Sequence, residues 1–363
     1  MLRRLRRRLC RLLCTAASSA ILLARRGRTR HQLLPAAAPF RTALARGCAT
    51  EDAPSTSMAA LLSLLVSAVT AAAPHLVVVS GAGRGVGLGV ARQVLRQDAV
   101  TEVCILARYL DKAAAVASAL GPRAHAVQCD VTDEGSCSAA ARTIADIGGD
   151  ALLSLVNNAG YAADLPWFPS PWPAEAARHT LAVNLFGAER LTRALLPHLL
   201  ATRDGRVVFV SSGGGRLNMK RMSDARRRTL LDTDLLRWSD LCELAATFTA
   251  EYEHAASRQT AAGGQHLPYM SPSGLWLQSY GFSKACLGAY CCVLARSHPS
   301  LLSVTCSPGW VATDMSSTYR GDAEMRTIDE GGEVPAWLAS GERGAMQTGF
   351  YMPDRSRVSW VAE

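Results

Sequence analysis

The sequence lacks the cysteine spacings that mark a disulfide framework or a cysteine-bound metal. It has 11 cysteines, an odd number, and contains no Cys-x-x-Cys pair. The tightest spacings are Cys10 with Cys14 and the neighbours Cys291 and Cys292, and neither resembles a metal knuckle. We therefore expect no metal centre, and free thiols buried in a protein of a reducing compartment.

Acidic residues are missing from the first 50 positions, which hold 12 arginines and no lysine. The whole chain of 363 residues has 39 Lys and Arg against 30 Asp and Glu, a formal net charge of +9. Beyond position 50, 27 basic residues face 30 acidic ones, so that part carries a net charge of −3. The basic excess therefore gives no reason to expect a nucleic-acid partner for the folded part.

The arginines of residues 1–50 recur at helical spacing among leucines. An amphipathic, Arg-rich leader without acidic residues is typical of a mitochondrial presequence, so we predict a mitochondrial location. A secretory signal is the competing interpretation, because residues 12–24 form a short apolar core, but arginines follow where a small-residue cleavage site would be expected. The third interpretation is a cytoplasmic protein with a non-functional leader.

No apolar run reaches the roughly 20 residues that span a bilayer. The strongest candidate, 58–73, has 16 residues, includes Ser63, Ser67 and Thr70, and precedes Pro74. It is interpreted as a linker or docked helix; a membrane anchor is the alternative, and Met58 is an alternative start. We assign residues 1–74 to a targeting leader and linker, and residues 75–363 to one folded domain.

That domain begins with a buried strand and a glycine-rich turn. Residues 76–79 are all apolar, which predicts a strand covered on both faces of a parallel sheet. A turn with Gly81, Gly85 and Gly87 follows, and then a helical pattern. This order lets the backbone approach a pyrophosphate at the helix N-terminus. The spacing is G-x-x-x-G-x-G rather than G-x-G-x-x-G.

Two arginines favour NADP(H) over NAD(H). About 20 residues past the last motif glycine, an NAD-specific site would place an acid on the ribose, but this sequence has Arg108 there. Arg84 lies within the glycine-rich turn. A 2′-phosphate needs cationic partners, so we predict NADP(H) as the cofactor. The alternative is that both arginines only solvate the surface.

Further strands alternate with helices and end in polar residues. Asp130 follows the third strand and can accept a hydrogen bond from an adenine amine, and Ser211 and Ser212 follow the fifth. The alternation predicts an α/β fold with a doubly wound parallel sheet, the Rossmann fold. Strands are expected at 102–106, 124–128, 152–156 and 206–210.

Tyr280 and Lys284 open an apolar helix that runs to about Ser297. At a separation of four residues the two side chains share one helix face. A phenol with a pKa near 10 is a poor acid or base at neutrality, but a nearby ammonium and a positive nicotinamide ring favour the phenolate. A serine hydroxyl can hold a substrate carbonyl oxygen beside such a phenol.

These motifs occur in one order: the glycine-rich turn, Asn157-Asn158-Ala159-Gly160, Asn184, Ser212, Tyr280 with Lys284, and Pro308-Gly309. Over about residues 75–352 the sequence resembles the short-chain dehydrogenase/reductase family. The 67 residues between Ser212 and Tyr280, with helical leucine spacing over 230–256, resemble the carbonyl reductase branch of that family. The domain is therefore expected to carry a helical insertion at about 216–275.

The resemblance implies a role for each matching residue. Tyr280 would be the general acid that protonates the carbonyl oxygen, and Lys284 would bind the ribose hydroxyls and lower the pKa of Tyr280. Ser212 matches the catalytic serine better than Ser211, and Asn184 would hold a water that links Lys284 to solvent. The predicted cofactor contacts are Gly81, Arg84, Gly85, Val86, Gly87, Arg108, Asp130, Val131, Asn158, Ala159, Gly160, Tyr280, Lys284, Pro308, Gly309 and Thr313.

The predicted function is NADPH-dependent reduction of a small-molecule ketone, aldehyde or quinone. Alternatives are an alcohol or steroid dehydrogenase that works in the oxidative direction, and a non-catalytic cofactor-binding regulator on the same fold. In the branch that this chain resembles, the insertion covers the oligomerisation surface, which implies a monomer. Gly213-Gly214-Gly215 suggest flexibility after Ser212. Four tryptophans are candidates to line an apolar pocket, namely Trp167, Trp172, Trp276 and Trp310.

Overall fold

The computed structural model describes residues 75–97, 99–149, 151–168, 172–261, 270–344 and 346–362. The predicted leader and linker, 1–74, lie outside the described residues, as do residues 262–269 of the predicted insertion. No helix in the part of the chain that the structure describes is long and apolar enough to cross a membrane.

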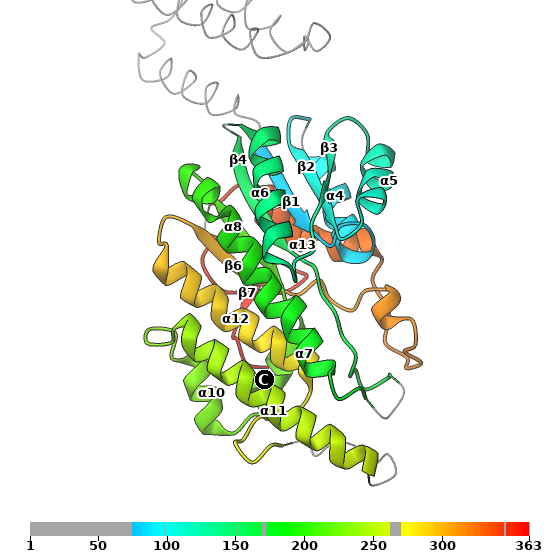
Figure 1. The fold of residues 1–363 in the computed structure, drawn as a ribbon. Coiled ribbons are helices and arrows are strands. Elements are labelled where there is room, and N and C mark those ends of the chain that lie inside the picture. The colour runs from blue at the N-terminus through cyan, green and yellow to red at the C-terminus, as the bar shows by residue number, and fades with distance from the viewer. Residues whose placement is uncertain are drawn as a thin grey trace, which may run out of the picture. The chain divides into compact units, whose positions relative to one another are not determined.

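The described residues form an eight-stranded sheet, drawn in Figure 1. Its strands are β1 (His75–Ser80), β2 (Glu102–Ala107), β3 (Ala124–Gln128), β4 (Leu152–Asn157), β5 (Arg206–Val210), β6 (Leu302–Cys306), β7 (Phe350–Tyr351) and β8 (Arg357–Val358). They lie in the order β3-β2-β1-β4-β5-β6-β7-β8, and all neighbours are parallel except β7 and β8. The strand order reverses between β1 and β4, and ligands of such sheets bind beyond the strand carboxyl ends at that point. This confirms the predicted doubly wound parallel sheet.

Helices cover both faces of the sheet, which explains why its strands are apolar throughout. The described helices are α4 (Gly85–Gln97), α5 (Leu110–Leu120), α6 (Glu134–Gly148), α7 (Ala176–Leu181), the π-helical turn η1 (Ala182–Gly187), α8 (Ala188–Ala201), α9 (Gly213–Arg221), α10 (Asp224–Leu231), α11 (Trp238–Ala261), α12 (Ser279–Ser297), the 3₁₀ turn η2 (Asp314–Ser316) and α13 (Ile328–Ser340). In β1, Val77 and Val79 pack with α4, α5 and α13, whereas Leu76 and Val78 pack with α6, α8 and α12 on the other face.

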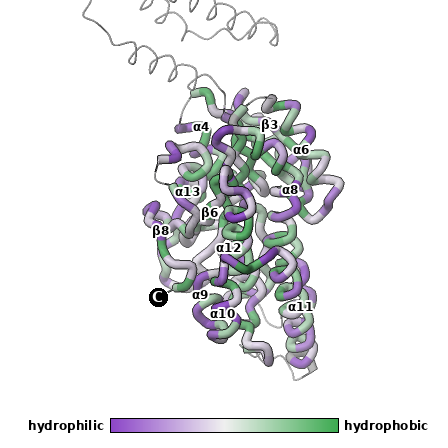
Figure 2. The backbone as a smooth tube through the Cα atoms, turned by 90° about the vertical axis from the view of Figure 1, so that its left-hand side faces the viewer, coloured by the Kyte–Doolittle hydropathy of each residue, from purple (hydrophilic) through white to green (hydrophobic). Residues whose placement is uncertain are grey.

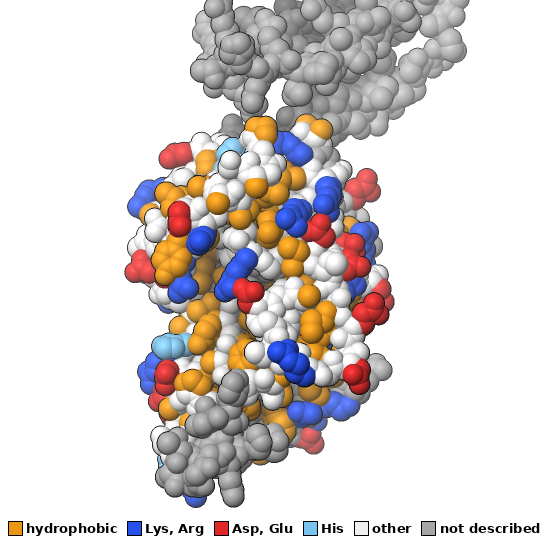
Figure 3. Space-filling model, turned by 90° about the vertical axis from the view of Figure 1, so that its right-hand side faces the viewer, with side chains coloured by type: hydrophobic (Ala, Val, Ile, Leu, Met, Phe, Trp, Pro, Cys, Tyr) orange, Lys and Arg blue, Asp and Glu red, His pale blue; other side chains and the backbone are white. Residues whose placement is uncertain are grey.

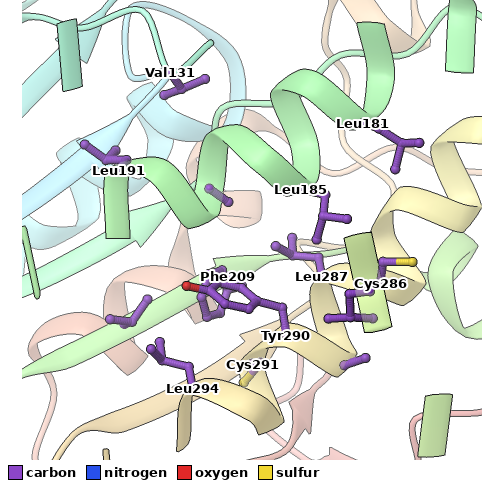
Figure 4. Packing of buried hydrophobic residues seen from close by; sticks show 14 of the residues in the cluster. Val131, Leu181, Leu185, Leu191, Phe209, Cys286, Leu287, Tyr290, Cys291 and Leu294 are labelled. Atoms are coloured by element: carbon purple, nitrogen blue, oxygen red, sulfur yellow. The ribbon is translucent and has the colours of Figure 1, made fainter. Parts of the chain in front are cut away.

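Helix α12 runs through the core, and its buried side chains hold it against β5 and η1. Figure 4 shows Tyr290 and Leu287 of α12 beside Phe209 of β5 and Leu185 of η1. The rings of Phe209 and Tyr290 are 5.5 Å apart in an edge-to-face arrangement. The helix that starts with Ser279 and Tyr280 is therefore fixed by its packing against β5 and η1.

The insertion is helical, and the stretch 230–256 with helical leucine spacing falls in two helices. Helix α10 ends at Leu231 and α11 begins at Trp238. The break has a local cause, because the Asp240 carboxylate accepts a hydrogen bond from the Arg237 backbone N–H at 2.8 Å and starts a new helix there. Figure 2 shows hydrophilic and hydrophobic stretches along α10 and α11, whereas hydrophobic segments gather in the interior.

The flexibility suggested for Gly213-Gly214-Gly215 is not what the structure shows, because these glycines form the first turn of α9. Ser212 is the N-cap, and its hydroxyl accepts a hydrogen bond from the Gly214 N–H at 3.0 Å. On the face shown in Figure 3, basic and acidic side chains are interspersed with hydrophobic ones, in keeping with the small net charge of the sequence after residue 50.

Candidate active site

A cavity of about 790 Å³ opens beyond the carboxyl ends of β5 and β6. It reaches from the glycine-rich turn after β1 to the start of α12, so it can hold both a cofactor ring and a substrate. Six predicted site residues lie on its wall, namely Val86, Ser212, Tyr280, Pro308, Gly309 and Thr313.

The backbone of Tyr280 is fixed at the first turn of α12. The Asp164 carboxylate, fully buried, accepts hydrogen bonds from the N–H groups of Ser279 and Tyr280, the latter at 3.3 Å. The Gln278 side chain accepts from the Gly281 N–H at 3.1 Å. Burial raises the pKa of Asp164, and the hydrogen bonds from the helix N-terminus oppose this rise. Asp164 is thus a positioning residue that the sequence analysis missed.

The phenol of Tyr280 faces the Ser212 hydroxyl at the inner end of the cavity. Burial raises the pKa of Tyr280 above its usual value, while the hydrogen bond with Ser212 works in the opposite direction. A Cβ atom added at Gly214 would lie 3.7 Å from the Tyr280 ring and 3.4 Å from the Ser212 hydroxyl. Before a cofactor binds, Tyr280 is therefore a protonated phenol at neutral pH, which is the form that an acid needs.

Lys284 lies one turn further along α12 and is buried. Its Nζ donates a hydrogen bond to the Val210 carbonyl oxygen at 2.7 Å and lies 5.8 Å from the centre of the Tyr280 ring. Burial lowers the pKa of Lys284 to about 8, although Cys306 works slightly against this shift. An ammonium has three donors, so this group can also bind hydroxyls of a ligand.

Asn184 lies in the π-helical turn η1, a kind of distortion that is frequent at functional sites. Its side chain accepts from the Tyr161 N–H at 2.8 Å and donates to the Tyr161 carbonyl and the Ser283 hydroxyl, both at 2.9 Å. A Cβ atom at Gly160 would lie 3.7 Å from Asn184 Oδ1 and 3.8 Å from Lys284 Nζ. The structure thus brings Asn184 and Lys284 together around Gly160, and the relay water stays a prediction.

The two serines after β5 differ in orientation. The Ser211 hydroxyl donates to the Lys284 carbonyl oxygen at 3.1 Å and thereby ties β5 to α12. The Ser212 hydroxyl lies beside Tyr280. This geometry supports Ser212 rather than Ser211 as the serine that meets a substrate.

The glycine-rich turn has the shape that a pyrophosphate cradle requires. Gly81 and Gly85 have φ angles of +64° and +57°, which favour glycine. A Cβ atom at Gly87 would lie 2.5 Å from the Asn158 side-chain nitrogen and 2.6 Å from the Gly81 carbonyl oxygen. Because α4 begins at Gly85, its N-terminal N–H groups point at the place where phosphates would lie. These residues fit a dinucleotide.

Ser80, which the sequence analysis passed over, locks β1 to the turn after β4. Its hydroxyl oxygen accepts from the N–H groups of Asn158 and Ala159, each at 3.0 Å. Asn158 in turn donates to the Ser80 carbonyl oxygen at 2.9 Å. The predicted cofactor residues Asn158 and Ala159 are thereby placed directly against the glycine-rich turn.

The structure gives Arg84 and Arg108 different partners. Arg84 forms an exposed ion pair with Asp314 of η2, the residue after Thr313. The Arg108 guanidinium lies over the Tyr109 ring at 5.4 Å. A Cβ atom at Gly83 would lie 3.8 Å from the Cβ of Lys112, so the base of this unpredicted lysine side chain also borders the turn. Its signal in the sequence is its place in the first turn of α5, four residues after Arg108.

The remaining predicted contacts lie on the turns after β3 and β6. Partial burial tends to raise the pKa of Asp130, but hydrogen bonds from Thr132 and the cations Arg108 and Arg190 hold it below its usual range. Val131 is buried, and its carbonyl oxygen accepts from Arg190 at 2.6 Å. Gly309 has φ +85°, and a Cβ at Gly85 would lie 3.6 Å from Thr313.

Comparison with known proteins shows which protein family this chain belongs to. A model described as short chain dehydrogenase matches residues 75–224. The chain is 32% identical to carbonyl reductase (NADPH) 3 of Rattus norvegicus over 277 residues, 72% of this chain and 89% of that protein. The chain belongs to the short-chain dehydrogenase/reductase family. This short-chain dehydrogenase/reductase is also 30% identical to carbonyl reductase (NADPH) 1 of Homo sapiens over 281 residues, 73% of this chain and 90% of that protein.

Solved structures share the fold of this short-chain dehydrogenase/reductase. Salutaridine reductase from Papaver somniferum aligns with a TM-score of 0.64 at 24% identity, over 77% of this chain and 99% of that one. The NADPH-bound carbonyl reductase from chicken fatty liver aligns with a TM-score of 0.54 at 21% identity, over 79% of this chain and 95% of that one.

All four candidate tryptophans of this short-chain dehydrogenase/reductase line the one cavity. Trp167 and Trp310 meet edge to face with ring centres 4.9 Å apart, and the Trp167 indole N–H donates to the Met315 carbonyl oxygen at 3.2 Å. Such walls favour flat, apolar ligands.

The glycines at the start of α9 allow a matched test of how the site is held. A Cβ at Gly215 would lie 2.8 Å from the Lys284 carbonyl carbon and 3.0 Å from the Ala285 nitrogen, whereas a Cβ at Gly213 meets nothing within 4 Å. We expect Gly215→Ala to lower the free energy of unfolding by about 1–3 kcal/mol, because α9 must move off α12. Gly213→Ala should be neutral or slightly stabilising.

Chemical denaturation of both variants measures these changes, and turnover shows whether the displaced α9 carries Ser212 with it. Equal stability and equal turnover in the two variants would show that close packing at Gly215 does not matter.

Proposed function

We propose that this protein is an NADP-dependent oxidoreductase that reduces a carbonyl compound, a ketone, aldehyde or quinone, to the alcohol. The observation that carries the proposal is the cluster at the inner end of the cavity. There the hydroxyls of Tyr280 and Ser212 adjoin each other, and the buried ammonium of Lys284 lies behind them. The curated relatives named above are carbonyl reductases (NADPH).

In the proposed reaction, different residues bind the carbonyl oxygen, protonate it and replace the transferred proton. The Ser212 hydroxyl donates a hydrogen bond that holds this oxygen, and the protonated Tyr280 phenol delivers its proton to it. Bound NADPH supplies the hydride that the carbonyl carbon receives. The Lys284 ammonium stabilises the phenolate that Tyr280 becomes, and Asn184 leads a replacement proton inward through the predicted water. Atoms and charge balance, because one hydride and one proton are added.

For the cofactor itself, Gly81, Gly85 and Gly87 would cradle the pyrophosphate, and Asp130 and Val131 would flank the adenine. Lys284 would bind the nicotinamide ribose, and Pro308, Gly309 and Thr313 the amide. Arg108 and Arg84 would hold the 2′-phosphate, with Lys112 beside them; Arg84 must exchange Asp314 for the phosphate to do so.

The test is NADPH oxidation by the purified full-length protein against a panel of quinones, aldehydes and ketones, with NADH in parallel. We expect turnover with NADPH and much poorer efficiency with NADH. Efficient turnover of alcohols with NADP⁺ but of no carbonyl would favour the dehydrogenase direction. NADPH binding without turnover in either direction would favour a regulator, and equal efficiency with NADH would contradict the assigned arginines.

We further propose a monomer. Helix α11 packs on α12, where Phe248 stacks on Phe282 at 3.9 Å between ring centres, so the chain covers this helix with its own insertion. A sedimentation mass of two or four chains would contradict this.

We propose a mitochondrial location on the composition of the leader, with the cytoplasm as the alternative. Recovery of a C-terminally tagged full-length chain in the cytosolic fraction alone would contradict it.

A further inference from the structure

We propose that the substrate is an aromatic carbonyl compound with an anionic group, such as a carboxylate, at its far end, and that Arg221 binds this group. The inference rests on the proposed carbonyl reduction and deepens it. Ser212 caps the start of α9, Arg221 is its last residue, and both line the cavity.

The length of α9 therefore fixes the distance between Ser212 and Arg221. Arg221 lies nine positions after the cap Ser212, so with a rise of about 1.5 Å per residue the two ends of α9 lie roughly 13 Å apart. The cavity wall is mostly apolar, with Leu217 from α9 and with Trp167, Trp172 and Trp276, while the polar side chains of Asn218 and Gln278 also line it. A ligand that fills this space is flat and hydrophobic in the middle, with its carbonyl oxygen at one end.

The charged residue of the cavity wall indicates which chemical group the ligand carries at the end away from its carbonyl. Among the described residues, Arg221 is the one charged side chain that lines the cavity. The ion pairs of the described residues leave it without a carboxylate partner. Positions 216–228 around it hold six basic residues and one acidic residue. An anion would therefore meet a favourable field as it approaches.

The guanidinium of Arg221, an exposed residue, stacks on one aromatic ring of the cavity wall. It lies 4.7 Å above the centre of the Trp276 ring, which occupies its flat face and leaves the N–H groups at its edge for a ligand. The Trp276 carbonyl oxygen accepts a hydrogen bond from the Asn218 side chain at 3.3 Å, one turn earlier on α9. The stacked ring and α9 thus form a prepared fork of the kind that binds carboxylates in two-point fashion.

Space at the inner end suits a broad carbonyl compound. Gly213 and Gly214 line the cavity beside Tyr280, and a side chain at Gly213 would meet no atom within 4 Å. The room there is wide enough for an aryl ketone or a quinone, whereas a small aliphatic aldehyde would leave most of the cavity unfilled.

The experiment compares 4′-acetylbiphenyl-4-carboxylate with its neutral methyl ester in the full-length protein. The biphenyl separates the carbonyl from the carboxylate by a span suited to α9. We expect the acid to have the higher kcat/KM, and Arg221→Gln to lower the kcat/KM of the acid at least about tenfold through KM, with a much smaller change for the ester. Lys220→Gln is the matched control, since this exposed cation on α9 is not among the residues that line the cavity.

A second readout does not need turnover. In the Tyr280→Phe variant, quenching of tryptophan fluorescence by the acid gives its dissociation constant, which Arg221→Gln should raise about tenfold and added salt should also raise. Equal affinity of acid and ester, or equal effects of Arg221→Gln and Lys220→Gln, would overturn the proposal. Arg221-dependent binding of the acid without any turnover would support the anion site and contradict the proposed reaction.

Discussion

Tyr280→Phe should reduce carbonyl reduction by at least about 10³-fold, because the variant lacks the only proton that the proposed mechanism places on the carbonyl oxygen. The benzyl side chain that replaces the phenol occupies nearly the same volume, so the fold and the cofactor cradle should stay intact. NADPH affinity is expected to change less than about threefold, since the glycine-rich turn and Lys284 keep their positions. Steady-state turnover and NADPH fluorescence titration measure the two effects.

The control for this experiment is Tyr290→Phe, which removes a tyrosine hydroxyl from the same helix. Tyr290 packs on Phe209 and Trp238 in the core, away from the cavity wall. Turnover should stay within about twofold of the unaltered protein, as is usual for a conservative change remote from the chemistry. If Tyr280→Phe kept substantial activity, Tyr280 would not be the acid.

The second prediction with a large effect concerns Lys284. We expect the ionisation of its side chain to determine how NADPH affinity depends on pH. The pKa of Lys284 is about 8 before the cofactor binds, because burial penalises the charge. Below pH 8 the side chain is an ammonium, which would attract the anionic cofactor and, in the proposed role, donate to its ribose. Above pH 8 it loses this charge, so NADPH affinity should be constant up to about pH 8 and then fall, approaching tenfold per pH unit.

Two substitutions of Lys284 separate the effect of its charge on NADPH binding from the effect of its side-chain shape. Lys284→Arg keeps its charge throughout this pH range, so the step near pH 8 should vanish. Lys284→Met should bind NADPH weakly at every pH and lose at least about 100-fold in turnover, because the preorganised donor is gone. Fluorescence titrations between about pH 6.5 and 9.5, a range that brackets the Lys284 pKa, measure the curves. A flat curve for the unaltered protein, or the same step in Lys284→Arg, would assign the pH dependence to another group.

The sequence predicted the central sheet well because its signals are local. Short apolar runs such as 76–79, rich in β-branched valine, favour strands buried on both faces, and the glycine-rich turn follows this one directly. Tyr280 and Lys284 share a helix face by spacing alone, and the structure places Tyr280 beside Ser212 and Lys284 beside Gly160.

What the sequence analysis missed depends on contacts between distant segments. Asp164 holds the start of α12 across 115 residues, and Ser80 fixes Asn158 across 78. Neither residue belongs to a pattern with its neighbours in the chain. The pairing of Arg84 with Asp314 across 230 residues is of the same kind. Gly215 likewise looks like a flexible residue until the backbone of α12 is placed against it.

Helix α9 carries Ser212 at one end, touches the backbone of Lys284 at Gly215 and presents Arg221 at the other end. The segment that selects a ligand is thus physically continuous with the segment that performs the chemistry. A substitution in this helix therefore changes substrate preference and catalytic rate together. In an enzyme that selects its substrate with a separate lid, the two properties could change independently. We expect the evolutionary freedom of this enzyme to lie in the segments that carry Trp167, Trp172 and Trp310, where the wall can change without a change in α9.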